Sequence, residues 1–138
     1  MSDTAMSRQV GVVLVSHSAA VAESVAQLAL GLAGGGTAPV AAAGGVPDGG
    51  LGTSAELISK AARSVDQGAG VAILADLGSA VLTVKTLLAE GDELPEESLL
   101  VDAPLVEGAV AAVVTASAGA DLAAVARAAE EAHGYRKV

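Results

Sequence analysis

The chain has 138 residues, 52% of them hydrophobic, so it is long and apolar enough to close one core in a single domain. Its net charge of −9, with only seven Lys and Arg residues, argues against a nucleic-acid-binding protein, because neutralising phosphates requires basic side chains. The absence of cysteine excludes disulfides and thiolate chemistry and fits a reducing cytoplasm.

The first part of the chain predicts a strand, a helix and a second strand. Residues 1–9 are polar with no apolar signal-peptide core, so we expect a disordered, solvated tail. The β-branched run at 10–15 predicts a strand, the segment 19–32 a helix ended by three glycines, and 39–43 another strand. The apolar stripe expected to face the core from that helix is Val21, Val25, Leu28 and Leu32.

A glycine-rich loop at 44–52 precedes the second predicted helix. The loop has no lysine and matches neither a Walker A sequence nor a dinucleotide fingerprint. Thr53 and Glu56 have the T-x-x-E spacing of a capping box, in which each side chain satisfies a free backbone amide of the other. We therefore expect the helix to start after Thr53 and to end at a C-cap glycine, Gly68.

The middle of the chain predicts another strand and helix. The continuous apolar run at 70–75 is typical of a parallel strand covered on both faces. A turn then leads into a helix over 79–89 that is apolar on nearly every side, and an acidic linker at 90–98 is expected to be solvated.

The last part predicts a short strand at 99–101 and two helices. Pro104 is suited to the first turn of a helix that ends near residue 118, and Asp121 is placed to cap the final helix. The helix over 105–118 is apolar around most of its circumference, which predicts burial in the core or packing on a second subunit; we expect a homodimer. Its most apolar part is too short to span a bilayer.

Strands alternating with helices predict an α/β fold with an open, doubly wound, mainly parallel four-stranded sheet and helices on both faces. The expected domain covers residues 10–133, and 134–138 form a tail. With the common strand order 2-1-3-4, the strands at 10–15 and 70–75 are neighbours at the switch point of the sheet. Their carboxyl ends carry His17 and Asp76, which this topology brings together.

His17 and Asp76 are candidates for a reactive pair. A carboxylate that accepts one imidazole N–H leaves the other ring nitrogen with a free lone pair. The alternative is that His17 is a surface turn residue and Asp76 only caps a helix. A phosphoryl acceptor fits the surroundings better than a hydrolytic base, because helix amides and the hydroxyls of Ser18 or Ser79 could receive phosphate oxygens. Without basic side chains nearby, such a phosphohistidine would remain easy to pass on.

Two other polar residues carry weaker signals. Thr53 could overhang the site, although a purely structural cap is the stronger interpretation. His133 lies among charged residues near the end of the chain and is expected to be exposed. With only two histidines and no cysteine, we expect no zinc site.

Sequence motifs spread over residues 10–132 resemble a known family. The runs are Leu-Val-Ser-His-Ser at 14–18, Gly-Thr at 52–53, Ala-Asp-Leu-Gly-Ser-Ala at 75–80 and Ala-Pro-Leu-Val-Glu-Gly-Ala at 103–109. Together, and in this order, they resemble the phosphotransfer subunit of bacterial dihydroxyacetone kinase (DhaM), which is related to the mannose-type enzyme IIA of the sugar phosphotransferase system.

The resemblance implies a doubly wound fold, a homodimer and a cytoplasmic phosphotransferase with a phosphohistidine intermediate and no cofactor. It implies that His17 is phosphorylated and that Asp76 orients it. Gly78 and Ser79 match the turn that meets the phosphate, and Thr53 matches a threonine near it.

The same resemblance implies the partners. The carrier protein HPr would supply the phosphoryl group, arriving as a separate protein. ADP bound on the kinase's nucleotide-binding subunit (DhaL) would receive it, and the ATP formed would phosphorylate dihydroxyacetone on a third subunit (DhaK). Two alternatives remain open: a mannose-type enzyme IIA that feeds a sugar permease, and a non-catalytic regulatory or ligand-binding α/β module.

Overall fold

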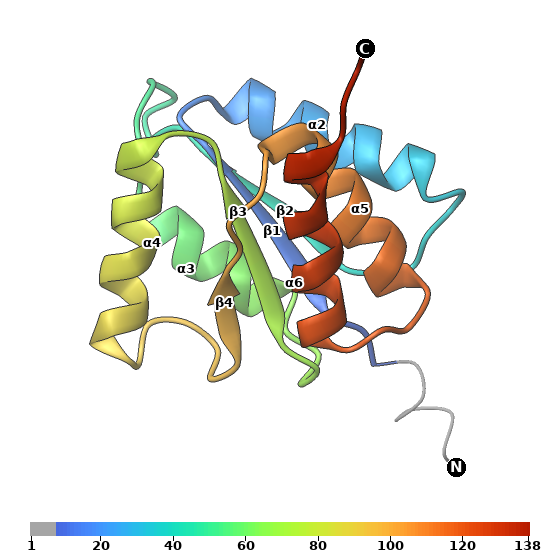
Figure 1. Cartoon of the computed structure of the whole chain (residues 1–138). Coiled ribbons are helices and arrows are strands. Elements are labelled where there is room, and N and C mark those ends of the chain that lie inside the picture. The colour runs from blue at the N-terminus through green and yellow to red at the C-terminus, as the bar shows by residue number, and fades with distance from the viewer. Residues whose placement is uncertain (1–7) are drawn as a thin grey trace.

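The computed structural model describes residues 8–138, which form a parallel four-stranded sheet in the order β2-β1-β3-β4 with helices on both faces (Figure 1). The predicted fold class and strand order are confirmed. Most of the predicted tail at 1–9 lies outside the described residues. In chain order the elements are β1 (Gly11–Ser16), α2 (Ala19–Leu32), β2 (Val40–Gly44), α3 (Ala55–Ser64), β3 (Val71–Ala75), α4 (Gly78–Glu90), β4 (Ser98–Leu100), α5 (Leu105–Ser117), α6 (Leu122–Glu131) and the 3-10 turn η1 (Ala132–Gly134).

The central strand β1 is buried along its whole length and pairs with both neighbours. Val15 lies opposite Ala43 of β2 and Ala75 of β3, so the carboxyl ends of β1 and β3 are level. The residues that follow these two ends, His17 and Asp76, therefore emerge at the same edge of the sheet.

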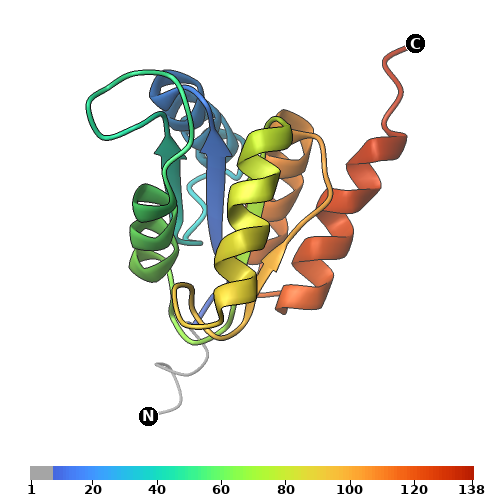
Figure 2. The same ribbon diagram turned by 90° about the vertical axis from the view of Figure 1, so that its left-hand side faces the viewer.

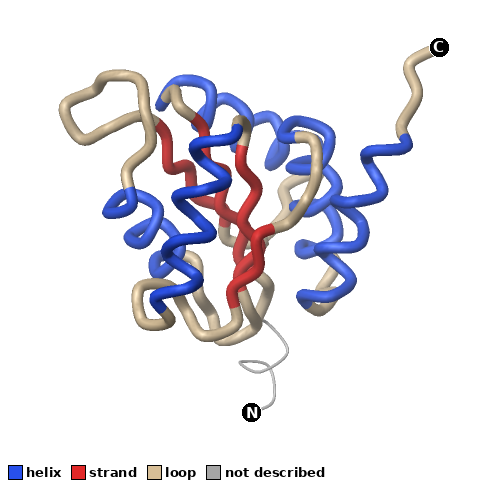
Figure 3. The backbone as a smooth tube through the Cα atoms, turned by 60° about the vertical axis from the view of Figure 1, so that its left-hand side comes forward, coloured by secondary structure: helices blue, strands red, loops and turns tan. Residues whose placement is uncertain are grey.

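Side chains alternate along β1 between two separate cores. Val12 and Leu14 pack with residues of α2, α5 and α6 on one face. Val13 and Val15 pack with residues of α3 and α4 on the other. Figures 2 and 3 show the sheet between these two helical layers. Burial on both faces explains why β1 and β3 are continuous apolar runs rather than alternating ones.

The predicted apolar stripe of α2 is wrong except at one position. Val25 is buried, but Val21 and Leu28 are each 45% exposed and Leu32 is 61% exposed. The helix instead turns small residues inward, because it packs closely against β2 and α5, where alanine leaves room for a neighbouring backbone. The residues of α2 that reach the core are Ala22, Val25, Ala26 and Ala29.

The predicted capping box is also wrong. Ser54, not Thr53, is the N-cap of α3: its hydroxyl accepts a hydrogen bond of 3.2 Å from Leu57 N. Two adjacent hydroxyl residues could each have capped the helix, and the hydroxyl of Thr53 instead contacts Thr83 of α4. The helix also ends earlier than predicted, at Ser64, and Gly68 follows as a turn residue with a φ of +87°.

Other predicted boundaries agree closely with the structure. The helix α2 spans the predicted range, and Asp121 caps α6 by accepting from Ala124 N at 2.9 Å. The acidic linker is anchored through its main chain, because Ser59 Oγ and Arg63 Nη1 both donate to Glu93 O. Within residues 8–138, no helix combines the length and the apolar character needed to cross a bilayer.

We expect Ser54→Ala to lower the free energy of unfolding by about 1 kcal/mol, because the Leu57 amide loses its only side-chain acceptor in the cap. Ser54→Asp keeps an acceptor and should leave stability within a few tenths of a kcal/mol of the parent. Urea unfolding followed by circular dichroism measures both. Equal stability of Ser54→Ala and the parent would contradict the assigned cap.

Candidate functional site

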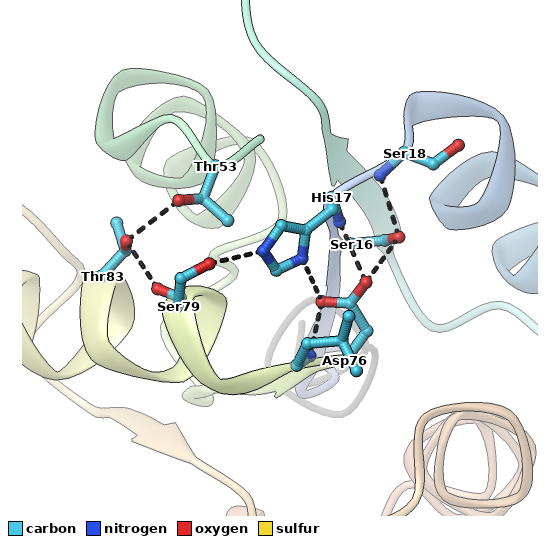
Figure 4. A network of polar contacts seen from close by, with 8 residues as sticks. Ser16, His17, Ser18, Thr53, Asp76, Ser79 and Thr83 are labelled. Atoms are coloured by element: carbon cyan, nitrogen blue, oxygen red, sulfur yellow. Dashed lines mark hydrogen bonds and ion pairs between the residues drawn. The ribbon is translucent and has the colours of Figure 1, made fainter. Parts of the chain in front are cut away.

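The candidate site lies where β1 and β3 end and α4 begins. Ser16 is the last residue of β1, and His17 follows it. Asp76 follows β3, and Gly78 is the first residue of α4. The site therefore occupies the carboxyl edge of the sheet between its two central strands, where open α/β folds bind ligands. Figure 4 shows the polar contacts made there.

The structure brings His17 and Asp76 together as predicted. His17 Nδ1 lies 3.0 Å from Asp76 Oδ1, and the backbone amide of His17 donates to Asp76 Oδ2 at 3.0 Å. Their side chains are 27% and 17% exposed, so the pair lies at the surface but is not fully solvated. An ionised carboxylate only accepts hydrogen bonds, which places the proton of a neutral imidazole on Nδ1 and leaves a lone pair on Nε2.

Ser79 occupies the other side of the imidazole. Its Oγ lies 2.5 Å from His17 Nε2. Because Nε2 carries the lone pair in this tautomer, the serine hydroxyl is the donor. The ring is thus held at both nitrogens, by a carboxylate from the end of β3 and by a hydroxyl from the first turn of α4.

Asp76 accepts from four donors. They are the backbone amide and Nδ1 of His17, the hydroxyl of Ser16 at 2.9 Å and the backbone amide of Leu77 at 2.6 Å. Burial raises the pKa of Asp76, but these hydrogen bonds outweigh it, so the pKa lies below its ordinary value. The carboxylate therefore stays ionised at neutral pH.

Ser16 is a residue of the site that the sequence prediction missed. It is 2% exposed, donates to Asp76 Oδ2 and accepts from the backbone amide of Ser18 at 3.1 Å. It thereby ties the carboxylate to the turn that carries His17. The available signal was a hydroxyl residue closing an otherwise apolar strand, since a buried hydroxyl requires a partner.

The remaining predicted site residues lie around this pair in different ways. Ser18 is the N-cap of α2, and its hydroxyl accepts from Val21 N at 3.3 Å while pointing away from the imidazole (Figure 4). Gly78 and Ser79 begin α4, whose N-cap residue Leu77 makes no side-chain capping bond. The first turn of α4 thus begins beside the imidazole, where the Ser79 hydroxyl contacts Nε2, and its N-cap residue supplies no side-chain acceptor.

Thr53 contacts α4 rather than His17. Its Oγ1 lies 3.2 Å from Thr83 Oγ1, and Thr83 in turn donates to the carbonyl of Ser79 at 2.9 Å. Thr83 has no distinguishing sequence signal, because it is one of several polar residues on an otherwise apolar helix.

The glycine-rich loop at 44–52 is fastened to the histidine turn. Gly52 N donates to His17 O at 2.9 Å, and Gly45 N donates to Ser16 O at 3.1 Å. Gly44 approaches so closely that a Cβ there would lie 2.4 Å from Ser18 O. Glycine is required in this part of the loop because the two backbones touch.

No Lys or Arg side chain contacts His17, Asp76 or Ser79 among the described residues. Asp76 and Lys85 line the same hollow, together with Asp102, which follows β4. His133 is exposed, as predicted, and its Nε2 lies 3.0 Å from Asp102 O.

The fold and the histidine–aspartate site agree with a family assignment. Residues 11–126 match the family EIIA-man, described as "PTS system fructose IIA component", and the chain belongs to this family. The predicted resemblance to mannose-type enzyme IIA is confirmed.

The curated relatives point to one branch of the family. The chain is 38% identical to "PEP-dependent dihydroxyacetone kinase 2, phosphoryl donor subunit DhaM" of Listeria innocua, over 76% of this chain and 84% of that protein. It is 40% identical to the DhaM subunit of Pantoea ananatis over 82% of this chain but only 24% of that longer protein. The crystal structure of EF1359, a protein of unknown function, is 30% identical and matches with a TM-score of 0.79 over 94% of this chain and 98% of that one.

The lowered pKa of Asp76 predicts a pH-dependent contribution to stability. Its pKa is lower in the folded than in the unfolded chain, so the unfolded state binds more protons as the pH falls below about 4. The contribution of the carboxylate is therefore present above that pH and is lost as the pH falls through the folded-state pKa. Asp76→Asn should destabilise the protein more at pH ~7 than at pH ~3, as measured by urea unfolding. If Asp76→Asn lowered the free energy of unfolding equally at both pH values, the lowered pKa of Asp76 would be contradicted.

Proposed function

We propose that this chain is a phosphoryl donor subunit of a dihydroxyacetone kinase, which accepts a phosphoryl group on His17 Nε2 and passes it to ADP. The observation that supports this most directly is the imidazole held at Nδ1 by an ionised carboxylate, with the lone pair of Nε2 directed toward the uncapped start of α4. The names of the curated relatives support the same branch of the family.

In the first transfer, the lone pair of His17 Nε2 attacks the phosphorus atom of a phosphohistidine on HPr. A new P–N bond forms on His17, the P–N bond to HPr breaks, and its electron pair returns to the HPr nitrogen. The His17 ring gains positive charge, which the Asp76 carboxylate stabilises through the retained Nδ1–H. The Ser79 hydroxyl, which had donated to Nε2, turns to a phosphoryl oxygen.

In the second transfer, a terminal phosphate oxygen of ADP on DhaL attacks the phosphorus atom. The bond from phosphorus to Nε2 breaks, and the imidazole returns to its neutral form with the proton still on Nδ1. The amides of Gly78 and Ser79 at the start of α4 are suited to hold the phosphoryl oxygens throughout. Because these donors are neutral, they bind the group less strongly than arginines would and favour its onward transfer.

The two alternative functions differ from this one in the fate of the phosphoryl group. A mannose-type enzyme IIA would pass it to a sugar permease component. A regulatory or ligand-binding module would not take it at all, although a neutral imidazole with its proton held on Nδ1 and its lone pair on Nε2 is arranged for reaction as well as for binding.

We expect the protein to gain the mass of one phosphoryl group when mixed with phosphoenolpyruvate, enzyme I and HPr, as measured by intact-mass spectrometry. His17→Gln should gain none, because glutamine lacks the nucleophilic nitrogen. Asp76→Asn should be phosphorylated about 100-fold more slowly or worse, since the amide no longer fixes the tautomer or stabilises the charged ring.

The acceptor is tested with the isolated phosphorylated protein. Adding DhaL loaded with ADP should remove the phosphoryl group and yield ATP, whereas a sugar permease component should not. Phosphorylation of His17→Gln would reject the site, and transfer to the permease alone would favour the first alternative. A parent protein that takes no phosphoryl group would favour the regulatory module.

We also infer that the chain forms a homodimer through the outer faces of α2 and α5. Leu28 and Leu32 on α2, and Val106 and Val114 on α5, are each more than 40% exposed. The one acidic side chain in the first turn of α5, Glu107, is neutralised by a contact of 2.5 Å with Lys137 Nζ. A self-associating face of this kind removes apolar surface from water on both copies. The hollow in this face is lined in part by Leu28, Leu32, Val106, Val110, Val114 and Tyr135.

We expect size-exclusion chromatography with light scattering to give a dimer at micromolar concentration. Val114→Asp should shift it to a monomer with an unchanged circular dichroism spectrum, because a charge would be buried without a partner in the dimer. Leu82→Asp is the matched control, since Leu82 is 64% exposed but lies on α4. A monomeric parent, or equal behaviour of the two variants, would contradict this interface.

A further inference from the structure

A series of hydrogen bonds links Thr53, just before α3, to the imidazole of His17 through Thr83 and Ser79. Thr53 Oγ1 contacts Thr83 Oγ1, Thr83 Oγ1 donates to the carbonyl of Ser79, and Ser79 Oγ contacts His17 Nε2 (Figure 4). Thr83 lies in the middle of α4 and touches neither the imidazole nor Asp76. It connects the residue that contacts Nε2 to a different element of the fold.

The direction of these hydrogen bonds follows from the number of protons available. A carbonyl oxygen only accepts, so the single hydroxyl proton of Thr83 is used on Ser79 O. Thr53 must then donate to Thr83 across their 3.2 Å contact. The proton of Thr53 is therefore directed toward α4 and is not offered to a phosphoryl group.

This arrangement matters because Ser79 must change partner during the reaction. Once Nε2 is bonded to phosphorus, it has no lone pair, and the Ser79 hydroxyl must rotate to a phosphoryl oxygen. The main chain of Ser79 must stay in place meanwhile, because its amide belongs to the uncapped first turn of α4. The bridge through Thr83 fixes that main chain from one side and is itself fixed by Thr53.

We propose that Thr83 is a positioning residue for phosphoryl transfer, which braces the first turn of α4 against Thr53 so that Ser79 stays aligned with Nε2. This inference rests on the proposed function and changes the expected role of Thr53. Thr53 acts through the bridge to α4 rather than as a direct phosphate ligand.

The helix itself provides a matched control. Thr86 is three residues further along α4, and its hydroxyl donates to Leu82 O at 3.0 Å, the same bond to the fourth preceding carbonyl that Thr83 makes. Thr86 is exposed, and its hydroxyl has no threonine partner among the described contacts. Replacing either threonine by valine removes the hydrogen bond from its hydroxyl to the fourth preceding carbonyl. Only Thr83→Val also removes the contact with Thr53.

We expect Thr83→Val to slow phosphorylation by HPr roughly five- to tenfold, about the effect of one misplaced hydrogen bond on a transition state. Thr86→Val should keep the parent rate, and Thr83→Ser should restore it by restoring the hydroxyl. Phosphoryl-transfer rates are measured by rapid quench and intact-mass spectrometry, with unfolding midpoints recorded to compare the stability of the two valine variants.

Two combinations separate positioning from direct contact. In a Ser79→Ala background, Thr83→Val should slow transfer by a smaller factor than in the parent, because the hydroxyl that Thr83 aligns is gone and only the backbone amide at position 79 remains to be positioned. Thr53→Val combined with Thr83→Val should be no slower than Thr83→Val alone, since the single variant already removes the whole bridge. Additive losses in either pair, or equal rates for Thr83→Val and Thr86→Val, would overturn the proposal.

A measurement on the unphosphorylated protein separates the bracing role of Thr83 from the proposed phosphoryl transfer. The 15N resonance of His17 Nε2 reports its hydrogen bond to Ser79, so Thr83→Val should shift it and Thr86→Val should not. If the parent accepts no phosphoryl group but the resonance shifts, the proposed function fails, whereas the alignment of Ser79 with Nε2 by Thr83 stands. If the parent is phosphorylated but the resonance and the rate are unchanged in Thr83→Val, only the bracing role fails.

Discussion

The site depends on one carboxylate. Asp76 accepts four hydrogen bonds from groups that belong to the end of β1 and to the turn before α4. It therefore joins two neighbouring strands and a helix and at the same time fixes which imidazole nitrogen carries the proton. The buried hydroxyl of Ser16 donates one of these hydrogen bonds. A carboxylate with these donors stays ionised, and an ionised carboxylate in this position keeps the lone pair of His17 on Nε2.

Around this carboxylate, neutral groups surround His17 Nε2, the nitrogen that we propose carries the phosphoryl group. Hydroxyls and helix amides stand where arginines bind phosphate in many other proteins. Lys85 of α4 lines a hollow that Asp76 also lines, but it makes no hydrogen bond to His17 or Asp76 among the described residues. In the proposed role the protein must both accept and release a phosphoryl group, so moderate binding suits it better than strong binding. The hydroxyl bridge of Thr53 and Thr83 has the same character, because it orients groups without adding charge.

The composition of the core also shapes the surface. With one aromatic residue in the chain, α2 packs on the sheet mainly through alanines, and its leucines are left facing outward beside the apolar face of α5. Close packing of small side chains thus leaves exposed the apolar face through which we propose that the chain dimerises. The hydrophobic periodicity of α2 predicted that its valines and leucines face the core. The short distance between α2 and the sheet instead leaves room there mainly for alanines.

The sequence by itself determined the order of elements, the parallel sheet and the meeting of His17 with Asp76, because apolar runs fix the strands and level parallel strands bring their ends together. It also carried the motifs of the enzyme IIA family. Tertiary structure alone decided that Ser54 caps α3, that Ser16 supports Asp76 and that Thr83 bridges Thr53 to Ser79. In each case a hydroxyl meets a partner of a different kind: an amide for Ser54, a carboxylate for Ser16, and a carbonyl and a second hydroxyl for Thr83. The partners of Ser16 and Thr53 are 60 and 30 residues away along the chain, so packing of the elements and not sequence spacing brings them together.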